Sequence, residues 1–256
     1  VYRQLGAPSY SLGLGIPGAI SPQTGLVKNA NTTCLIGQDL PTDLNNRLNL
    51  IAPVRIANDA DCLALSEASD GAGEGYRSVV AVIIGTGCGG GWAIQQQLHS
   101  GPNAIAGEWV HNPLPSSDAS AHPRPCYSGK LGCTETYVSG PGMSQHAERL
   151  SGRKHSAEHW HQLALTGDAE ALKVMTYYQR CLARALASII NVMDPAAIVL
   201  GGGLSNLASL YDTIPTLWSD YVFSDQVVTP LLQAQHGDSS GVRGAAWLGG
   251  QSFMSQ

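Results

Sequence analysis

The stretch S-V-V-A-V-I-I-G-T-G-C-G-G-G-W-A-I-Q-Q, residues 78–96, decides the fold. Its first seven residues form a continuous apolar run, which is typical of a strand covered on both faces. The glycine cluster Gly85–Gly91 follows, and Trp92–Gln96 is predicted to be a second strand. The stretch therefore predicts a hairpin whose turn is nearly all glycine. Glycines at the end of a buried strand let backbone N–H groups turn toward a bound anion.

Two more glycine clusters follow predicted strands. Gly15–Gly18 ends the strand 10–16, and Gly201–Gly203 ends the strand 197–200. Neither a Walker motif nor a dinucleotide-binding fingerprint is present, because Gly85–Gly91 leads into a strand rather than a helix. Any single cluster is compatible with an ordinary tight turn. Three clusters at strand ends favour a nucleotide that is held from several sides.

The remaining pattern alternates strands and helices, which indicates an α/β fold. In the helix 168–193 an apolar stripe recurs at helical spacing and predicts core packing rather than a cofactor site. Thr42 and Asp238 are predicted N-caps. The predicted strands are 10–16, 26–28, 53–57, 78–84, 92–96, 197–200 and 226–233, and the predicted helices are 40–48, 58–70, 139–150, 157–165, 168–193, 206–218 and 241–248.

Composition excludes several classes of protein. The chain has 256 residues, of which 43% are hydrophobic and 13% charged, so it can bury a large core. A net charge of −5 without a basic run argues against nucleic acid as a partner. We find no membrane-length apolar run and no leader peptide. Six cysteines without disulfide-framework spacing indicate a reducing, cytoplasmic location.

Residues 108–135 hold the densest chemistry of the chain. Glu108 and His111 lie together, and Cys126, Cys133 and Glu135 follow. Two thiols, one imidazole and a glycine-rich hairpin predict a metal clip, while a surface loop with chance cysteines is the alternative. Ser128 stands where a third thiol would complete a C-x-C pair.

Asp59 is the candidate general base, because it lies at a predicted strand-to-helix junction. A helix N-cap is the alternative role for a carboxylate at that position. Asn58, Glu108, His111 and Glu135 accompany it, and together these side chains suit a polyol ligand, since each can donate to or accept from a hydroxyl.

Motifs along nearly the whole chain resemble the ROK family, and within it the bacterial fructokinase/mannokinase-type kinases. The resemblance implies an actin-like ATPase (ribonuclease H-like) fold of two α/β domains, with residues 1–73 plus 238–256 as an incomplete small domain and 74–237 as the large one. The motifs are G-I-P-G at 15–18, V-K-N-A-N at 27–31, A-N-D-A at 57–60, V-I-I-G-T-G-C-G-G-G at 82–91, A-G-E-W-V-H-N-P-L-P at 106–115, C-Y-S-G-K-L-G-C-T-E at 126–135, I-V-L-G-G-G-L-S at 198–205 and H-G-D-S-S-G-V-R-G-A-A-W-L at 236–248.

The resemblance also implies roles. Asp59 would take the proton of a hexose 6-hydroxyl during transfer from Mg-ATP, with fructose the expected acceptor and mannose or glucose next. Asn58, Glu108, His111 and Glu135 would hold the sugar, and His111, Cys126 and Cys133 would hold zinc. Gly85, Thr86, Gly87 and Gly89 would form a phosphate loop, Gly201, Gly202 and Gly203 would meet the adenosine, and the family suggests a homodimer.

Three departures from the family pattern modify these expectations. No D-x-G-G-T phosphate loop precedes Gly15, so we expect little or no kinase activity of this polypeptide. Ser128 replaces a cysteine, which predicts weak zinc binding or none. Val110 replaces a glycine, and a β-branched residue would misdirect His111 if its backbone required a positive φ. The alternative functions are a sugar-binding ROK transcriptional regulator and a catalytically impaired homologue.

Overall fold

In a computed structural model, which describes residues 10–30, 32–48, 50, 52–115 and 123–254, the chain is built around a mixed five-stranded sheet. The strand order is β7-β6-β5-β8-β9. β5 runs parallel to β8 and β8 parallel to β9, while β5–β6 and β6–β7 are antiparallel. The strands are β5 Ser78–Ile84, β6 Cys88–Ile94, β7 Gln97–Leu98, β8 Ala197–Gly201 and β9 Leu231–Gln233.

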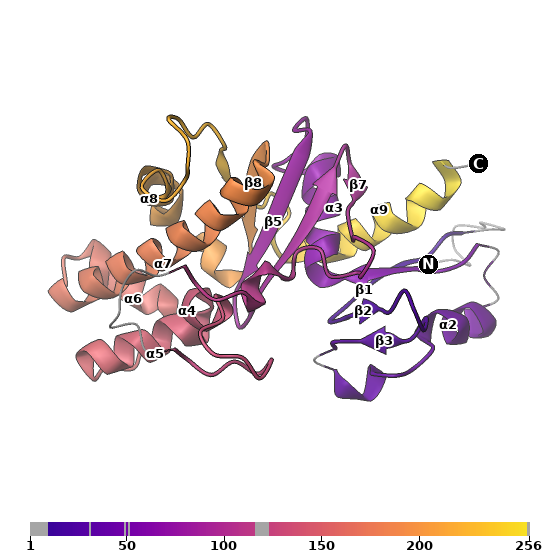
Figure 1. The fold of residues 1–256 in the computed structure, drawn as a ribbon, viewed down its shortest axis with the longest axis horizontal. Coiled ribbons are helices and arrows are strands. Elements are labelled where there is room, and N and C mark those ends of the chain that lie inside the picture. Colours follow the sequence, from indigo (N-terminus) through magenta and orange to yellow (C-terminus); the bar gives the residue numbers. More distant parts are fainter. Residues whose placement is uncertain (1–9, 31, 49, 51, 116–122, 255–256) are drawn as a thin grey trace.

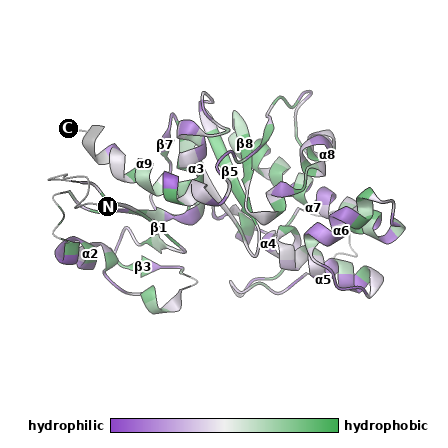
Figure 2. Ribbon diagram, turned by 180° about the vertical axis from the view of Figure 1, so that it is seen from behind, coloured by the Kyte–Doolittle hydropathy of each residue, from purple (hydrophilic) through white to green (hydrophobic). Residues whose placement is uncertain are grey.

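Both faces of β5 are covered, as its continuous apolar run predicts. Val80, Val82 and Ile84 belong to the main core on one face, whereas Val79 and Ala81 pack in a second cluster on the other. A strand alternates its side chains between the two faces, so only an all-apolar run can bury both. Figure 2 shows the apolar colouring of β5 and β8 between their covering helices.

Helices from the second half of the chain supply the main core. The longest is α7 Ala169–Met193, which packs with α8 Ser209–Trp218 beside the sheet (Figure 1). Met175, Leu182 and Leu186 of the predicted stripe are buried, whereas Leu172 is exposed. The other helices on this side are α4 Glu135–Val138, α5 Gly140–Ser151 and α6 Ala157–Leu165.

A smaller body contains two short sheets. β1 Gly13–Ile16 pairs in parallel with β4 Arg55–Asn58, and β2 Ala19–Ile20 pairs with β3 Val27–Lys28. The helices α2 Leu40–Leu48 and α9 Ser240–Met254 complete it (Figure 1). A Cβ at Gly13 would overlap the carbonyl oxygen of Ala245, so only glycine lets β1 lie this close to α9.

Helix α3 Asp59–Asp70 joins the two bodies. Its residues Leu63, Ala64 and Ala68 pack on the five-stranded sheet, and its other side lies along α9. The division of the chain at 73/74 and 237/238 stays a prediction, since α3 contacts both parts.

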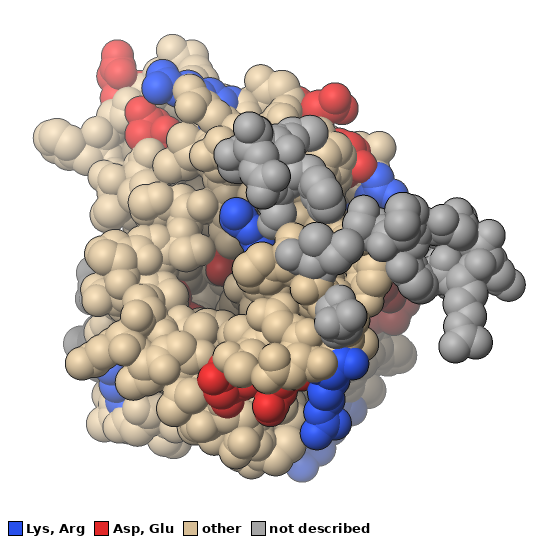
Figure 3. Space-filling view, turned by 90° about the vertical axis from the view of Figure 1, so that its right-hand side faces the viewer, with Lys and Arg blue, Asp and Glu red and all other residues tan. Residues whose placement is uncertain are grey.

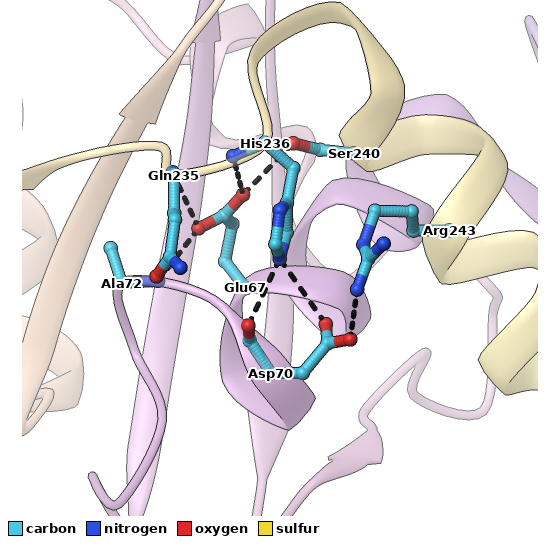
Figure 4. Close-up of polar contacts among 7 residues, drawn as sticks. All are labelled: Glu67, Asp70, Ala72, Gln235, His236, Ser240 and Arg243. Atoms are coloured by element: carbon cyan, nitrogen blue, oxygen red, sulfur yellow. Dashed lines mark hydrogen bonds and ion pairs between the residues drawn. The ribbon is translucent and has the colours of Figure 1, made fainter.

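A buried carboxylate fixes the end of α3. Glu67 is fully buried, and its two oxygens accept hydrogen bonds from the backbone N–H groups of Ala72, Gln235 and His236 and from the Ser240 hydroxyl (Figure 4). Four donors satisfy the charge without a cation. This network ties α3 to the segment that leads into α9.

Asp70 extends the same connection at the surface. Its carboxylate pairs with Arg243 of α9 and lies 3.4 Å from His236 Nε2, which also contacts the Asp70 carbonyl oxygen at 2.9 Å (Figure 4). The end of α3 opposite Asp59 is therefore held firmly against α9.

Several predicted element boundaries were wrong. Gly89–Gly91 lie inside β6 rather than in the turn, and glycine is needed there because a Cβ at Gly91 would overlap the Ala60 carbonyl oxygen of α3. The short helix α4 was not predicted. β9 is shorter than 226–233, and α9 continues beyond residue 248.

Two predicted caps were also wrong. Asp39, not Thr42, accepts a hydrogen bond at the start of α2, from the backbone N–H of Thr42. Asp238 lies in the short 3-10 helix Gly237–Ser239 that precedes α9. The predicted motif residue Asn31 and the loop 116–122 lie outside the described residues. Within the described part of the chain, the helices are all too short or too polar to cross a membrane.

Candidate functional site

One cavity of about 920 Å³ brings together predicted site residues from distant parts of the chain, while Gly85, Gly201–Gly203, Cys126 and Cys133 lie outside its lining. Figure 3 shows the molecule hollowed, with an acidic side chain visible inside the hollow. The lining combines acidic, amide and imidazole groups with a glycine-rich backbone, and only a few apolar side chains. The predicted residues that line it are Asn58, Asp59, Thr86, Gly87, Gly89, Glu108, His111, Ser128 and Glu135.

The start of α3 brings the candidate base into the cavity. Asn58 is the N-cap, because its side-chain oxygen accepts from the Asp61 backbone N–H at 3.0 Å. Asp59 is thus not the cap, and its carboxylate accepts at 2.8 Å from the Ala60 backbone N–H. Burial raises the pKa of Asp59 above its usual range, partly offset by backbone hydrogen bonds. A carboxylate with a raised pKa is a stronger base than a solvated one.

Asp61 is an acidic group that the sequence analysis did not single out. Its Oδ1 is buried without a hydrogen-bond partner among the described residues. Burial raises the pKa of Asp61 to about 7, and the negative charges of Glu108 and Asp59 add to the rise. The sequence carries no local signal for this role, because after burial the largest contribution comes from Glu108, which is distant in the chain.

The 3-10 helix Glu108–His111 presents two more predicted residues. Gly107 precedes it with a φ of 98°, and a Cβ there would overlap the Gly90 carbonyl oxygen of β6. His111 Nε2 lies 3.7 Å from Glu108 Oε2. The backbone strain that was expected at Val110 is absent. Val110 lies within this helix and does not have a positive φ, and its side chain is buried in the main core.

The predicted metal ligands converge. Ligand atoms of His111, Cys126 and Cys133 all lie within 4.8 Å of one another. His111 Nδ1 is 3.8 Å from Cys126 Sγ, and Ser128 Oγ is 3.6 Å from Cys133 Sγ. Two thiolates bound to one tetrahedral zinc lie about 3.8 Å apart, given Zn–S bonds near 2.3 Å. The donor set therefore fits zinc with three good ligands, and the Ser128 hydroxyl lies beside one of them, Cys133.

A direct hydrogen bond joins this hairpin to the glycine turn of the main sheet. Glu135 Oε2 accepts from the Cys88 backbone N–H at 3.2 Å. The backbone N–H of Gly140, at the start of α5, donates to the Gly85 carbonyl oxygen at 2.7 Å. The predicted sugar site and the predicted phosphate loop are therefore joined by hydrogen bonds into one connected structure.

The third glycine cluster lies beside this turn but outside the cavity lining. Gly202 has a φ of 82°, and a Cβ there would come within 2.6 Å of the Ile84 carbonyl oxygen. A Cβ at Gly85 would be 3.8 Å from the Gly203 backbone nitrogen. Gly201–Gly203 and Gly85 thus form adjacent strand ends, and the adenosine contact assigned to the former stays a prediction.

Other cavity residues had no assigned role. Asn29 and Thr33 line it from the smaller body, and Asn112, Tyr127 and Lys130 from the larger one. Lys28 Nζ contacts the Asn103 carbonyl oxygen at 2.6 Å, which links the two bodies near the rim. These residues adjoin the motifs in sequence, but sequence spacing does not show which side chains face a cavity.

The fold and the site define a two-body α/β protein with a polar cleft that is flanked by glycine turns. The sequence profile of the ROK family matches residues 2–252, and the chain belongs to that family. It is 37% identical over 242 residues to the N-acetylgalactosamine kinase AgaK of Shewanella sp. (strain ANA-3), covering 93% of this chain and 78% of the relative. It is 36% identical over 244 residues to an N-acetyl-D-glucosamine kinase of Haemophilus influenzae (strain 86-028NP), covering 93% and 80%.

Solved structures agree. A ROK hexokinase from Thermus thermophilus matches with a TM-score of 0.85 at 25% identity, covering 100% of this chain and 83% of that one. A ROK family glucokinase from Streptomyces griseus in complex with glucose and AMPPNP matches with a TM-score of 0.79 at 26% identity, covering 97% and 84%. The predicted fold class is confirmed. The family is confirmed too, but its fructokinase/mannokinase branch is not.

Proposed function

We propose that this protein transfers the γ-phosphoryl group of ATP to the 6-hydroxyl of a hexose. The proposal departs from the expectation of little or no activity drawn from the missing D-x-G-G-T motif, because relatives that match 93% of this chain are named as sugar kinases. The supporting observation is the convergence of Asn58, Asp59, Glu108, His111 and Glu135 with the turn at Thr86–Gly89 on one cavity. The relatives are named as sugar kinases, which agrees with this chemistry.

In the proposed reaction Asp59 accepts the proton of the hexose hydroxyl as that oxygen attacks the γ-phosphorus in line. Phosphoryl transfer depends on positioning and electrostatic stabilisation more than on covalent chemistry. Backbone N–H groups of the glycine turn would cradle the phosphates, since their Cβ-free surface admits close approach. Magnesium bound to the nucleotide would neutralise phosphate charge.

The polar walls would orient the sugar. Asn58 keeps its side-chain NH₂ group as a donor, because the amide oxygen is engaged at the helix cap. Glu108 and Glu135 would accept from sugar hydroxyls, and the His111 ring would contact the sugar beside them. Zinc on His111, Cys126 and Cys133 would serve as a scaffold that fixes the His111 ring, with no part in the transfer itself.

The identity of the hexose is the finer part of the proposal. Fructose is the acceptor predicted from the sequence. Relatives at 36–38% identity are named N-acetylgalactosamine and N-acetyl-D-glucosamine kinases. We therefore place an N-acetylhexosamine ahead of fructose, mannose and glucose as the acceptor.

A coupled assay tests the function. The full-length gene product is supplied with Mg-ATP and each sugar in turn, and ADP release is measured. We expect release that requires the sugar, with N-acetylglucosamine or N-acetylgalactosamine giving the highest kcat/KM. Asp59→Asn should lower kcat by roughly a hundredfold or more, the range typical of a lost general base.

The matched control is Asp220→Asn, at an exposed aspartate in the turn after α8. It should leave turnover unchanged. Sugar binding without turnover in the wild-type protein would overturn the kinase proposal in favour of a sugar-sensing regulator. A higher kcat/KM for fructose than for both N-acetylhexosamines would overturn the acceptor assignment alone.

A further inference from the structure

Tyr127 lies in the hairpin between Cys126 and Cys133. It lines the cavity, yet its side chain is 72% exposed. A tyrosine with so little packing contributes little to the stability of the hairpin. Its position therefore calls for a functional explanation.

The Tyr127 hydroxyl is held by a predicted sugar ligand. It lies 3.1 Å from His111 Nε2, and the two rings meet edge to face with centroids 5.3 Å apart. Glu108 Oε2 lies farther from the same nitrogen, at 3.7 Å. Hydrogen bonds of N–H donors to oxygen cluster near 2.9–3.0 Å, so Tyr127 is the better-placed partner.

The two nitrogens of His111 face different surroundings. Nδ1 lies 3.8 Å from Cys126 Sγ, on the side of the thiols, and Nε2 faces the cavity. With the proton on Nε2, that N–H donates to the Tyr127 oxygen. The Tyr127 O–H then remains free to donate to another acceptor, such as a hydroxyl oxygen of a bound sugar.

The ring of Tyr127 supplies a second kind of contact. Among the exposed large apolar side chains of the described residues, those that line the cavity are Ile105 and Tyr127. A sugar ring is polar at its edge but presents C–H groups on its faces. An exposed aromatic ring beside the polar ligands gains free energy when such a face covers it, and it loses little side-chain freedom.

We propose that Tyr127 is a sugar-contacting residue. Its hydroxyl positions His111 and donates to a sugar hydroxyl, and its ring closes the cavity wall against the C–H face of the sugar. This inference rests on the proposed function, because it adds a contact to the same sugar site.

The test compares Tyr127→Phe, Tyr127→Ala and the control Leu131→Ala. Leu131 lies in the same hairpin and is 62% exposed, but it does not line the cavity. Calorimetry measures the Kd of N-acetylglucosamine without nucleotide, and the coupled assay measures the KM of sugar and of ATP. Thermal unfolding of each variant checks that it is folded.

We expect Tyr127→Phe to raise the sugar Kd by roughly three- to tenfold, the value of one net hydrogen bond. Tyr127→Ala should raise it further, because it also removes the ring. The KM of ATP should stay within about twofold of the wild-type value, since a lost sugar contact does not reach the phosphate turn. Leu131→Ala should behave as wild type.

The proposal is overturned if folded Tyr127→Ala binds the sugar as tightly as wild type does. It is equally overturned if Leu131→Ala weakens sugar binding as much, or if the KM of ATP rises in parallel, because those results describe a loosened hairpin. A wild-type protein that binds the sugar but does not phosphorylate it refutes the kinase activity while the comparison of Kd values still decides the role of Tyr127. A wild-type protein that binds none of the hexoses refutes both.

Discussion

Glu135 Oε2 accepts a hydrogen bond from the Cys88 backbone N–H at 3.2 Å, so a predicted sugar ligand directly holds the glycine turn of the main sheet. The same carboxylate oxygen lies 3.3 Å from where a Cβ of Gly87 would stand. One side chain therefore connects the two halves of the proposed reaction, the acceptor and the phosphates. Removal of this side chain should therefore impair the binding of both the sugar and the phosphates.

Glu135→Ala is predicted to raise the KM of the sugar and the KM of ATP together. The sugar loses an acceptor, and the turn loses the bond that fixes Cys88, so misplacement of the phosphates should also lower kcat by roughly tenfold or more. Steady-state kinetics with each substrate varied measures this. Glu148→Ala is the control, because Glu148 lies on the surface of α5 and pairs only with Lys154 among the interactions described. A change confined to the sugar KM would contradict the shared role.

The pH profile of kcat/KM should report Asp59. Its carboxylate must be ionised to accept a proton, and burial raises its pKa above the ordinary 3.8. We therefore expect kcat/KM to rise with pH along an acid limb whose apparent pKa lies above that of a solvated aspartate. An acid limb at or below about 4 would contradict a raised pKa of Asp59. The profile is measured with the sugar well below its KM.

Much of the fold was predictable, because the local sequence preference and the tertiary packing favour the same secondary structure. The run Ser78–Ile84 forms a strand buried on both faces as predicted, and the predicted helix 168–193 forms as α7, with Asp168 as its cap rather than its first residue. The start of β6 was not predictable. Glycines 89–91 have low strand propensity, yet they pair with residues 81–83 of β5, and the close approach of α3 and Trp109 explains why these positions are glycine.

The candidate site was predictable as far as its residues belong to local motifs. Asn58 and Asp59 lie at a predicted helix start, and Glu135 stands directly beside the cysteine hairpin. Asp61 and Tyr127 were missed, because their importance comes from neighbours distant in sequence. The charge of Glu108 raises the pKa of Asp61, and His111 Nε2 contacts the Tyr127 hydroxyl. No spacing rule brings such pairs together before the chain is folded.

Asp61→Asn is predicted to stabilise the protein above neutral pH. The pKa of Asp61 is about 7 in the folded chain and near 3.8 when unfolded, so the folded state binds the extra proton between these values. Its contribution to stability is thus full below about pH 4, falls as pH rises toward 7 and stays low above it. At pH 8 the variant should gain on the order of 2 kcal/mol, and at pH 4 almost nothing.

Urea unfolding at both pH values measures the effect of Asp61→Asn, with Asp220→Asn as the exposed control. Equal stability of variant and wild type at pH 8 would show that Asp61 is solvated or paired in the folded protein.

Ser128→Cys should strengthen zinc binding. The Ser128 oxygen already lies 3.6 Å from Cys133 Sγ, close to the separation of two ligands on one tetrahedral zinc. A thiolate there completes four ligands with His111, Cys126 and Cys133, whereas a hydroxyl is a poor ligand at neutral pH. We expect the wild-type protein to lose zinc on dialysis against a chelator and the variant to retain about one zinc per chain, measured by elemental analysis. Retention of one zinc per chain by the wild type would contradict the predicted weak site.

Gly107→Ala should be among the most destabilising glycine-to-alanine substitutions in this chain. Gly107 has a φ of 98°, and its added Cβ would overlap the Gly90 carbonyl oxygen of β6. Backbone strain and steric overlap should together cost roughly 2–4 kcal/mol of unfolding free energy. Gly152→Ala is the matched control: its φ is 69°, but nothing lies within 4 Å of the new Cβ, so only the backbone cost of about 1 kcal/mol applies.

Because Gly107 sets the direction of the helix that carries Glu108 and His111, Gly107→Ala should also raise the sugar KM while Gly152→Ala leaves it unchanged. Urea unfolding and steady-state kinetics measure the two effects, and equal losses in the two variants would mean that the close approach of Gly107 to β6 does not constrain the site.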